Sequence, residues 1–235
     1  MARAPRHAPG GIIFHTLNRG VGRRQIFDKP QDYLAFERVI ADALAAEPLH
    51  VLAYCLMPNH WHLLLRPEQD GQLGRFMQRL TMTHTRRWQE HYHEVGTGHL
   101  YQGRFKSFPV QHDGHFLTVA RYIERNALRA GLVERAEDWP WSSLWRRAGR
   151  VYDSQRPALP LANWPMEQPS DWLAWVHEPQ TDAELNELRM AVGRGRPFGS
   201  GPWRSSMVER LNLQSSERAR GRPRKAETRQ EARNA

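Results

Sequence analysis

The chain has 235 residues, 40% of them hydrophobic, and its 34 Lys and Arg against 25 Asp and Glu give a net charge of +9. This composition excludes a disordered chain, and no apolar stretch reaches the ~20 residues that a membrane span needs. The single cysteine, Cys55, excludes an internal disulfide and a cysteine-based zinc site. The arginine-rich balance favours a nucleic-acid partner over a membrane, with an ordinary basic protein as the alternative.

Residue patterns predict alternating strands and helices through the first half of the chain. Strands are indicated by β-branched and aromatic residues, helices by apolar residues at three- and four-residue spacing. In chain order we expect strand 11–18, helix 28–47, strand 49–57, strand 60–66, helix 71–93 and an extended segment or strand 100–110. This is the split βαβ order of an α+β, ferredoxin-like or RRM-like antiparallel sheet.

Side-chain alternation along the strand 60–66 separates its residues into two faces. His60 and His62 share one face, whereas Trp61 and Leu63 share the other, which is the core face. Two imidazoles one strand repeat apart are a starting point for a divalent metal site. Two half-exposed histidines on a polar face are the alternative. If both helices cover one face of the sheet, the other face is free for a site.

A third helix is expected over 116–132, ending at Gly131, and it carries a polar stripe beside its apolar one. Tyr122 and Asn126 are four residues apart on this stripe and therefore share a face. Two histidines and an asparagine oxygen can hold Mg²⁺ or Mn²⁺. A tyrosine beside such an ion can lose its proton and attack phosphorus, although a surface tyrosine with no chemical role is also common.

Three stretches of sequence carry a family resemblance in this order. They are Tyr-Cys-Leu-Met-Pro-Asn-His-Trp-His-Leu-Leu at 54–64, Tyr-Gln-Gly-Arg-Phe-Lys-Ser at 101–107 and Tyr-Ile-Glu-Arg-Asn-Ala-Leu-Arg-Ala-Gly-Leu at 122–132, followed by Trp-Pro-Trp-Ser-Ser at 139–143. Together they resemble the single-tyrosine HUH transposases of the IS200/IS605 type, and most of all the REP-associated tyrosine transposases. The resemblance covers about residues 10–150, so we expect an HUH nuclease core over 8–150.

The resemblance implies that His60 and His62 are metal ligands, that Tyr122 is the nucleophile, and that Asn126 stands where the family has its third ligand, often a glutamine. Tyr122 would then attack a phosphate of single-stranded DNA, forming a 5′-phosphotyrosine link and releasing a 3′-hydroxyl. A second 3′-hydroxyl would later rejoin the strands. The implied cofactor is Mg²⁺ or Mn²⁺. The implied partner is a short REP-like palindrome, recognised as a hairpin with a guide sequence at its foot.

The last third of the chain changes in character. We expect a linker and helical cover over 151–192 and a basic DNA-binding extension over 193–235 with a disordered tail. Trp164, Trp172 and Trp175 are expected to cap the core, with base stacking as the alternative. Gly195-Arg196-Pro197 and Gly221-Arg222-Pro223 resemble hooks that enter the minor groove of DNA, and a plain basic tail is the alternative.

Arginines and one lysine in these segments are candidates for contacts with DNA. They are Arg19, Arg104, Lys106, Arg125, Arg129, Arg196, Arg222 and Arg224. Three rival functions stay open: a DNA-hairpin binding module that does not cleave, a metal phosphodiesterase that uses water, and an RNA-binding ferredoxin-like domain. We expect a monomer, with a dimer as the alternative. The absence of an apolar signal segment at 1–10 predicts a cytoplasmic, nucleoid-associated protein.

Overall fold

A four-stranded antiparallel sheet forms the centre of the computed structural model, which describes residues 7–150 and 156–218. The strands are β1 (Ile13–Arg19), β2 (His50–Met57), β3 (His60–Arg66) and β4 (Lys106–Val110). Their order across the sheet is β2-β3-β1-β4, with all neighbours antiparallel. With one helix after β1 and one after β3, this is the split βαβ arrangement that the sequence predicts. The expected α+β fold class is confirmed.

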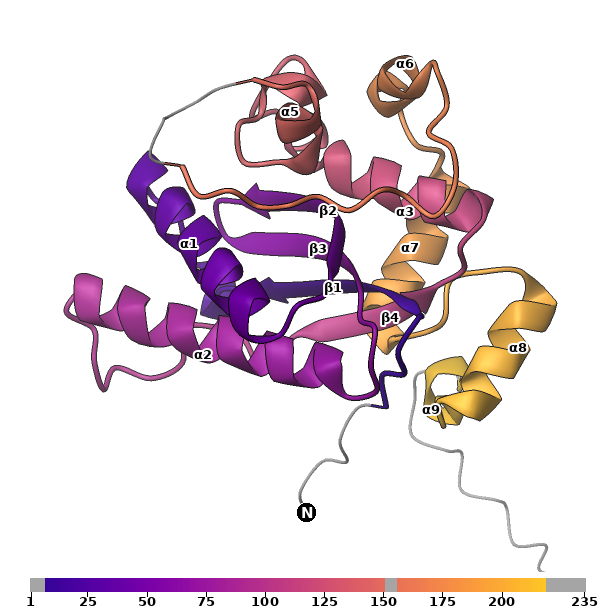
Figure 1. The fold of residues 1–235 in the computed structure, drawn as a ribbon, viewed down its shortest axis with the longest axis horizontal. Helices are drawn as coiled ribbons and strands as arrows, with labels where there is room; N and C mark the ends of the chain where they lie inside the picture. Colours follow the sequence, from indigo (N-terminus) through magenta and orange to yellow (C-terminus); the bar gives the residue numbers. More distant parts are fainter. Residues whose placement is uncertain (1–6, 151–155, 219–235) are drawn as a thin grey trace, which may run out of the picture.

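Helices surround the sheet on both sides (Figure 1). They are α1 (Pro30–Ala46), α2 (Gln72–His91), α3 (Gly114–Glu124), α4 (Asn126–Arg129), α5 (Ser143–Arg147), α6 (Trp172–His177), α7 (Asp182–Arg194), α8 (Gly201–Arg210) and α9 (Gln214–Glu217), with short 3₁₀ turns η1 (Val21–Arg23) and η2 (Ala136–Asp138). None of the described helices is long and apolar enough to cross a membrane.

Two of the helices, α1 and α3, begin where side chains cap their first turn. Pro30 occupies the first turn of α1, and the carboxylate of Asp32 accepts hydrogen bonds from the backbone N–H groups of Asp28 and Lys29. At α3, the Asp113 side chain accepts from the N–H of His115. Pro58 and Asn59 form the tight turn between β2 and β3, as expected.

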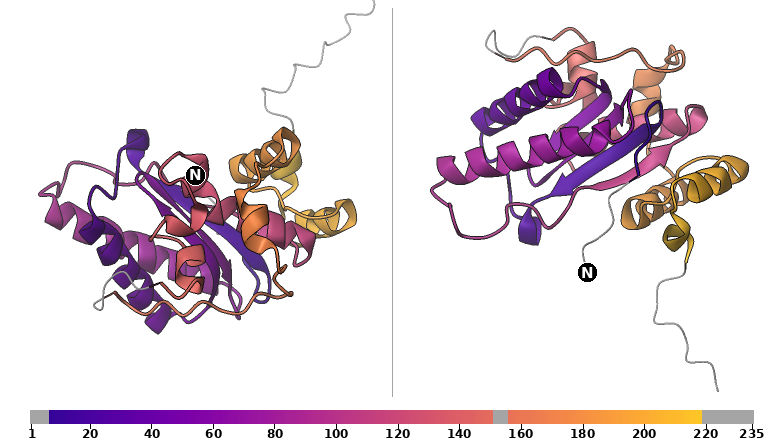
Figure 2. Two further views of the ribbon diagram at one scale, coloured as in Figure 1. Left: turned by 90° about the horizontal axis from the view of Figure 1, so that it is seen from above. Right: turned by 60° about the horizontal axis from the view of Figure 1, so that its bottom comes forward.

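One face of the sheet packs on α1 and α2, which lie side by side in Figure 1 and in the right view of Figure 2. We call it the helix face. Trp61, Leu63 and Leu65 of β3 are buried here against both helices, as their alternation predicts. The opposite face, which we call the histidine face, packs on α3. Leu64 is buried there with Phe116 and Ile123.

The expectation of an open second face is therefore wrong. The C-terminal third supplies apolar side chains that close much of it, including Trp172 of α6 and Leu188 of α7, both nearly inaccessible to solvent. Trp164 and Trp175 pack at the edge of the same cluster. The three tryptophans thus cap this core, which is the structural role that the sequence favours for them.

Two elements differ from their expected bounds. The segment 100–110 joins the sheet as β4 only from Lys106, because the residues before it turn away after a single bridge between Tyr101 and Gly20. The expected helix 116–132 begins earlier and is divided at Arg125 into α3 and α4.

The first Gly-Arg-Pro segment is built into the fold and does not form a free hook. Gly195 ends α7 in the left-handed conformation (φ 71°). Phe198 then runs beside β4, where its N–H donates to the Pro109 carbonyl, and Arg196 forms an ion pair with Glu217 at 2.9 Å. The structure thus gives 195–197 a packing role, and a contact of Arg196 with the minor groove stays a prediction. Arg222, Arg224 and the predicted disordered tail lie outside the described residues.

Candidate active site

Two histidines project from β3 toward the histidine face, with ring centroids 5.0 Å apart. His60 Nδ1 lies 2.5 Å from Asn59 Oδ1. An amide oxygen only accepts, so Nδ1 carries the proton of this hydrogen bond and the Nε2 lone pair is left free. The turn residue that closes the hairpin thus also orients the first imidazole of the pair.

A third histidine, His15 of β1, completes the row. His15 Nε2 lies 2.8 Å from His62 Nδ1, and the two rings stack with centroids 5.0 Å apart and planes 6° apart. Sequence reasoning missed His15, because a single histidine in an apolar strand resembles a core residue. The position of His15 on its strand could have indicated that it belongs to this face. β1 lies beside β3, and the observed register pairs Leu17 with His62, which places His15 on the same face.

Tyr122 and Arg129 face this histidine row from α3 and α4. The Tyr122 ring centroid is 5.7 Å from that of His62 and 6.3 Å from that of His15. The Arg129 guanidinium lies 4.6 Å from the Tyr122 ring centroid. Arg129 also donates to Asn126 Oδ1 at 2.6 Å and to the Tyr122 hydroxyl at 3.4 Å. The predicted residues His60, His62, Tyr122, Asn126 and Arg129 therefore come together.

Burial keeps the imidazoles of this cluster neutral. It lowers the pKa of His15 to about 3 and is also the main reason why the pKa of His60 falls to about 3. The positive charges of Arg19 and Arg129 lower the His60 pKa further. The pKa of His62 is well below its ordinary value because of burial, His15 and His60. Neutral imidazole is the form that binds a metal ion.

Several buried polar atoms of the cluster have no partner among the described residues. They are His15 Nδ1, Arg19 Nε and Asn126 Nδ2. An arginine Nε and an amide nitrogen only donate hydrogen bonds, and a buried donor without an acceptor costs about 1–3 kcal/mol. Two cationic side chains, Arg19 and Arg129, flank the same place. The site thus offers unused donors and positive charge to an anionic group.

The helix that carries Tyr122 is held by buried polar contacts. Glu124 is fully buried and accepts from Ser143 Oγ at 2.7 Å and from Trp172 Nε1 at 2.8 Å, while burial raises its pKa. Arg121 donates to the carbonyls of Trp175 and Glu178 at the end of α6. These contacts fix α3 between the sheet and α6, and therefore fix the place of Tyr122.

Arg125 has the same kind of role, which differs from the expected contact with DNA. Its Nη1 donates to the carbonyls of Val176 and His177, at 2.8 and 2.5 Å. A cation there also suits the partial negative charge at a helix C-terminus. Arg125 therefore ties α6 to the junction of α3 and α4 and does not extend toward the histidine row.

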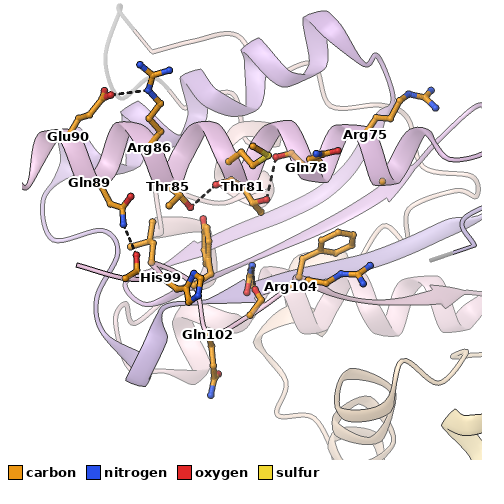
Figure 3. A pocket seen from close by; sticks show the side chains of 18 of the residues that line it. Arg75, Gln78, Thr81, Thr85, Arg86, Gln89, Glu90, His99, Gln102 and Arg104 are labelled. Atoms are coloured by element: carbon orange, nitrogen blue, oxygen red, sulfur yellow. Dashed lines mark hydrogen bonds and ion pairs between the residues drawn. The ribbon is translucent and has the colours of Figure 1, made fainter. Parts of the chain in front are cut away.

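The other predicted cations lie in two places. Arg19 pairs in register with His60, and Lys106 lies in one row with Leu17 and His62, so both belong to the histidine face. Arg104 precedes β4 and lines a groove beside α2 (Figure 3). Arg104 and Lys106 therefore lie in different places, because the strand begins only at Lys106 and does not include Arg104.

The donor set of the cluster is compatible with a divalent metal ion. Among the described residues, no three His, Cys, Asp or Glu side chains are arranged to hold one. This donor set has only two such side chains, His60 and His62, because its third ligand is the amide oxygen of Asn126. The hydrogen bonds at Nδ1 leave the Nε2 atom of His60 available, and Asn126 Oδ1 has a second lone pair beside the one that Arg129 uses. Imidazole nitrogen and amide oxygen atoms of this kind can coordinate a divalent metal ion.

Comparison with known proteins identifies the family. The family described as "Transposase IS200 like" matches residues 10–126, a range that contains His60, His62 and Tyr122. The chain belongs to the IS200-like transposases. This confirms the resemblance seen in the motifs. Enzymes of this family use a tyrosine nucleophile and generally a divalent metal.

Similar proteins carry related names. The REP-associated tyrosine transposase of Escherichia coli is 25% identical over 142 residues, 60% of this chain and 81% of that protein. A Haemophilus influenzae relative, provisionally given the same name, is 27% identical over 153 residues, 58% of this chain and 81% of that protein. A solved structure of a REP-associated tyrosine transposase bound to a REP hairpin aligns with a TM-score of 0.48 at 19% identity, covering 72% of this chain and 98% of that one.

Proposed function

We propose that this transposase nicks single-stranded DNA at hairpin-forming, REP-like sequences and transfers the strand through a 5′-phosphotyrosine intermediate. The observation that carries the proposal is the convergence of Tyr122 with three histidines and two arginines. These side chains come from β1, β3, α3 and α4 and meet on one face of the sheet. The names of the two curated relatives support REP-like DNA as the substrate.

The proposed chemistry needs few groups. The Tyr122 oxygen attacks the phosphorus, the bond between phosphorus and the 3′-oxygen breaks, and the phenol proton ends on the departing 3′-hydroxyl. A second 3′-hydroxyl reverses these steps on the same link. Arg129, which already contacts the Tyr122 hydroxyl, would bind the non-bridging phosphate oxygens together with Arg19. Mg²⁺ or Mn²⁺, when bound, would polarise the phosphate.

The metal would be held by Nε2 of His60, Nε2 of His62 and Oδ1 of Asn126. For His62 this requires one particular tautomer. If His62 Nδ1–H donates to His15 Nε2, the Nε2 lone pair of His62 is free, whereas the opposite donation places a proton on that Nε2. We therefore assign His15 a positioning role: it accepts from His62 and fixes the ring and tautomer of a ligand.

A denaturing gel tests the proposal. Labelled hairpin DNA from the regions that flank the gene is incubated with the protein and Mg²⁺ or Mn²⁺, beside Tyr122→Phe and a double His60→Ala/His62→Ala variant. We expect a heat-stable protein–DNA adduct with the wild type and none with either variant. Cleavage that survives Tyr122→Phe without an adduct would instead identify a phosphodiesterase that uses water. Binding without cleavage under either metal would identify a hairpin-binding module.

A further inference from the structure

A groove on the helix face is not used by the proposed chemistry. It has a volume of about 1150 Å³ and runs between α2 and the segment 98–105 (Figure 3). This volume exceeds the ~300–1,000 Å³ of typical small-molecule pockets, which favours an extended ligand. Its walls include Met82 and Val95, which are 63% and 71% exposed and so are two of the most exposed apolar side chains described.

Cationic and amide side chains line the groove beside these apolar residues. Arg75, Arg86 and Arg104 line the groove, and Arg104 is exposed with no hydrogen-bond or ion-pair partner among the described residues. Arg75 and Arg86 pair with Glu47 and Glu90, but both pairs are exposed and therefore weak. Gln78, Gln89 and Gln102 add amide groups. Apolar surface for stacking, amides for base edges and guanidinium groups for phosphates are the features of a single-strand binding surface.

The groove lining includes one glycine that packing within the protein does not require. Gly74 lies in the first turns of α2, where glycine costs about 0.5–1 kcal/mol relative to alanine. A Cβ placed there would meet no atom within 4 Å. Packing within the protein therefore does not explain the missing side chain, and the open position leaves room for a ligand along α2.

The groove leads to the candidate active site at one end of the sheet. Asn18 lines the groove and donates from Nδ2 to the Gly103 carbonyl, while the next residue, Arg19, accepts at its carbonyl from the Gln102 N–H. Consecutive strand residues point to opposite faces, so Arg19 lies on the histidine face beside His60. The groove and the candidate active site therefore adjoin at this end of β1, through two consecutive residues.

We infer that the groove between α2 and residues 98–105 binds unpaired nucleotides of the DNA strand whose phosphate is presented to Tyr122. The inference rests on the proposed function for the identity of the nucleic acid. It adds a binding surface on the face of the sheet opposite to the chemistry. The net charge of the lining favours DNA over an acidic or neutral peptide, because three arginines face one glutamate there.

Binding of defined probes tests the inference without cleavage. The probes are one blunt DNA hairpin and the same hairpin with an unpaired oligothymidine flank that contains 4-thiothymidine, both used with the Tyr122→Phe protein. We expect tighter binding of the flanked hairpin and ultraviolet crosslinks from the flank to residues 74–89 or 98–105. Met82→Glu should reduce the preference for the flank by about tenfold, because it places a charge against the bases.

The matched control is Met190→Glu, which alters another exposed methionine on α7, outside the groove lining. It should keep the wild-type preference. Equal affinity for the two hairpins, crosslinks that map elsewhere, or an unchanged preference in Met82→Glu would each overturn the inference. Adduct formation by the protein with Tyr122 intact is measured separately, so loss of the groove and loss of the proposed chemistry give different results.

Discussion

The two faces of the sheet each bury a histidine next to a tyrosine, yet they differ in how completely the polar atoms are paired. On the helix face, His84 Nδ1 lies 2.6 Å from the Tyr101 hydroxyl, which also accepts from Trp61 Nε1 at 3.0 Å. On the histidine face, His15, Arg19 and Asn126 supply three of the seven buried side-chain atoms that lack partners among the described residues.

This difference separates a structural cluster from a candidate site. His84 and Tyr101 would attract attention in any list of buried ionisable groups, since burial lowers the pKa of His84 to about 3. The Tyr101 hydroxyl and His84 Nδ1 are hydrogen-bonded within the protein, so these two atoms are not available to a ligand. On the histidine face, by contrast, unpaired donors lie beside positive charge, which suits the reacting phosphate of the proposed chemistry. Each prediction below tests that distinction.

The largest expected effect distinguishes the two tyrosines. Tyr122→Phe should abolish the covalent DNA adduct, because phenylalanine has no oxygen that can form the link to phosphorus. Tyr101→Phe should retain the adduct but lower the free energy of unfolding by about 1–3 kcal/mol, because Trp61 Nε1 loses its buried acceptor. A denaturing gel and urea unfolding measure the two outcomes. An adduct that survives in Tyr122→Phe would break the distinction.

His15 should affect metal affinity more than folding. His15→Phe removes the acceptor for His62 Nδ1–H and should weaken Mn²⁺ binding by about 10–100-fold, as second-layer partners of metal ligands typically do. Isothermal titration measures the affinity, and ¹⁵N chemical shifts report the tautomer of His62. His15→Gln, whose side-chain oxygen can accept, should recover part of the loss. If both variants bind Mn²⁺ like the wild type, His15 serves only to fill the core.

The sequence predicted the parts of the site that depend on local periodicity. Alternation along β3 correctly placed His60 and His62 opposite Trp61, and helical spacing placed Tyr122 with Asn126. The split βαβ class followed from the order of elements along the chain, whereas the order of strands across the sheet came from the structure. These features need only the two- and 3.6-residue repeats of regular structure.

Contacts between distant segments were beyond that reasoning. His15 and His62 are 47 residues apart, and only their strand register makes them partners. The third helix is divided at Arg125, whose side chain donates to carbonyl groups of Val176 and His177. These residues are more than 50 positions away in the sequence. The closure of the second face depends on Trp172 and Leu188, whose sequence pattern does not say which surface they cover.

The pH dependence of stability should involve one histidine from each face. Burial lowers the folded-state pKa of His15 and of His84 to about 3, below the ~6.5 of an unfolded chain. The unfolded state therefore takes up protons first as the pH falls below about 6.5, and each group removes up to about 1.4 kcal/mol of stability per pH unit down to its folded pKa.

Urea unfolding between pH 7 and pH 4 measures this slope. His84→Phe and His15→Phe should each make the decline shallower, whereas His112→Asn, at an exposed histidine, serves as the control. A decline that is as steep in both buried variants as in the wild type would mean that other groups control acid stability. Neither His15 nor His84 would then contribute measurably to the loss of stability at low pH.

The smallest expected effect concerns the groove on the helix face. Gly74→Ala should raise the free energy of unfolding by about 0.5–1 kcal/mol, because alanine favours the helix and its Cβ meets no atom within 4 Å. Gly20→Ala is the contrasting variant, since its Cβ would collide with the backbone oxygen of Arg24 and should destabilise the protein. Thermal unfolding measures both changes. If Gly74→Ala stabilises the chain but weakens binding of the flanked hairpin, the space beside Gly74 is needed for DNA and not for folding. If binding of the flanked hairpin is unchanged, the added methyl group does not reach the bound strand.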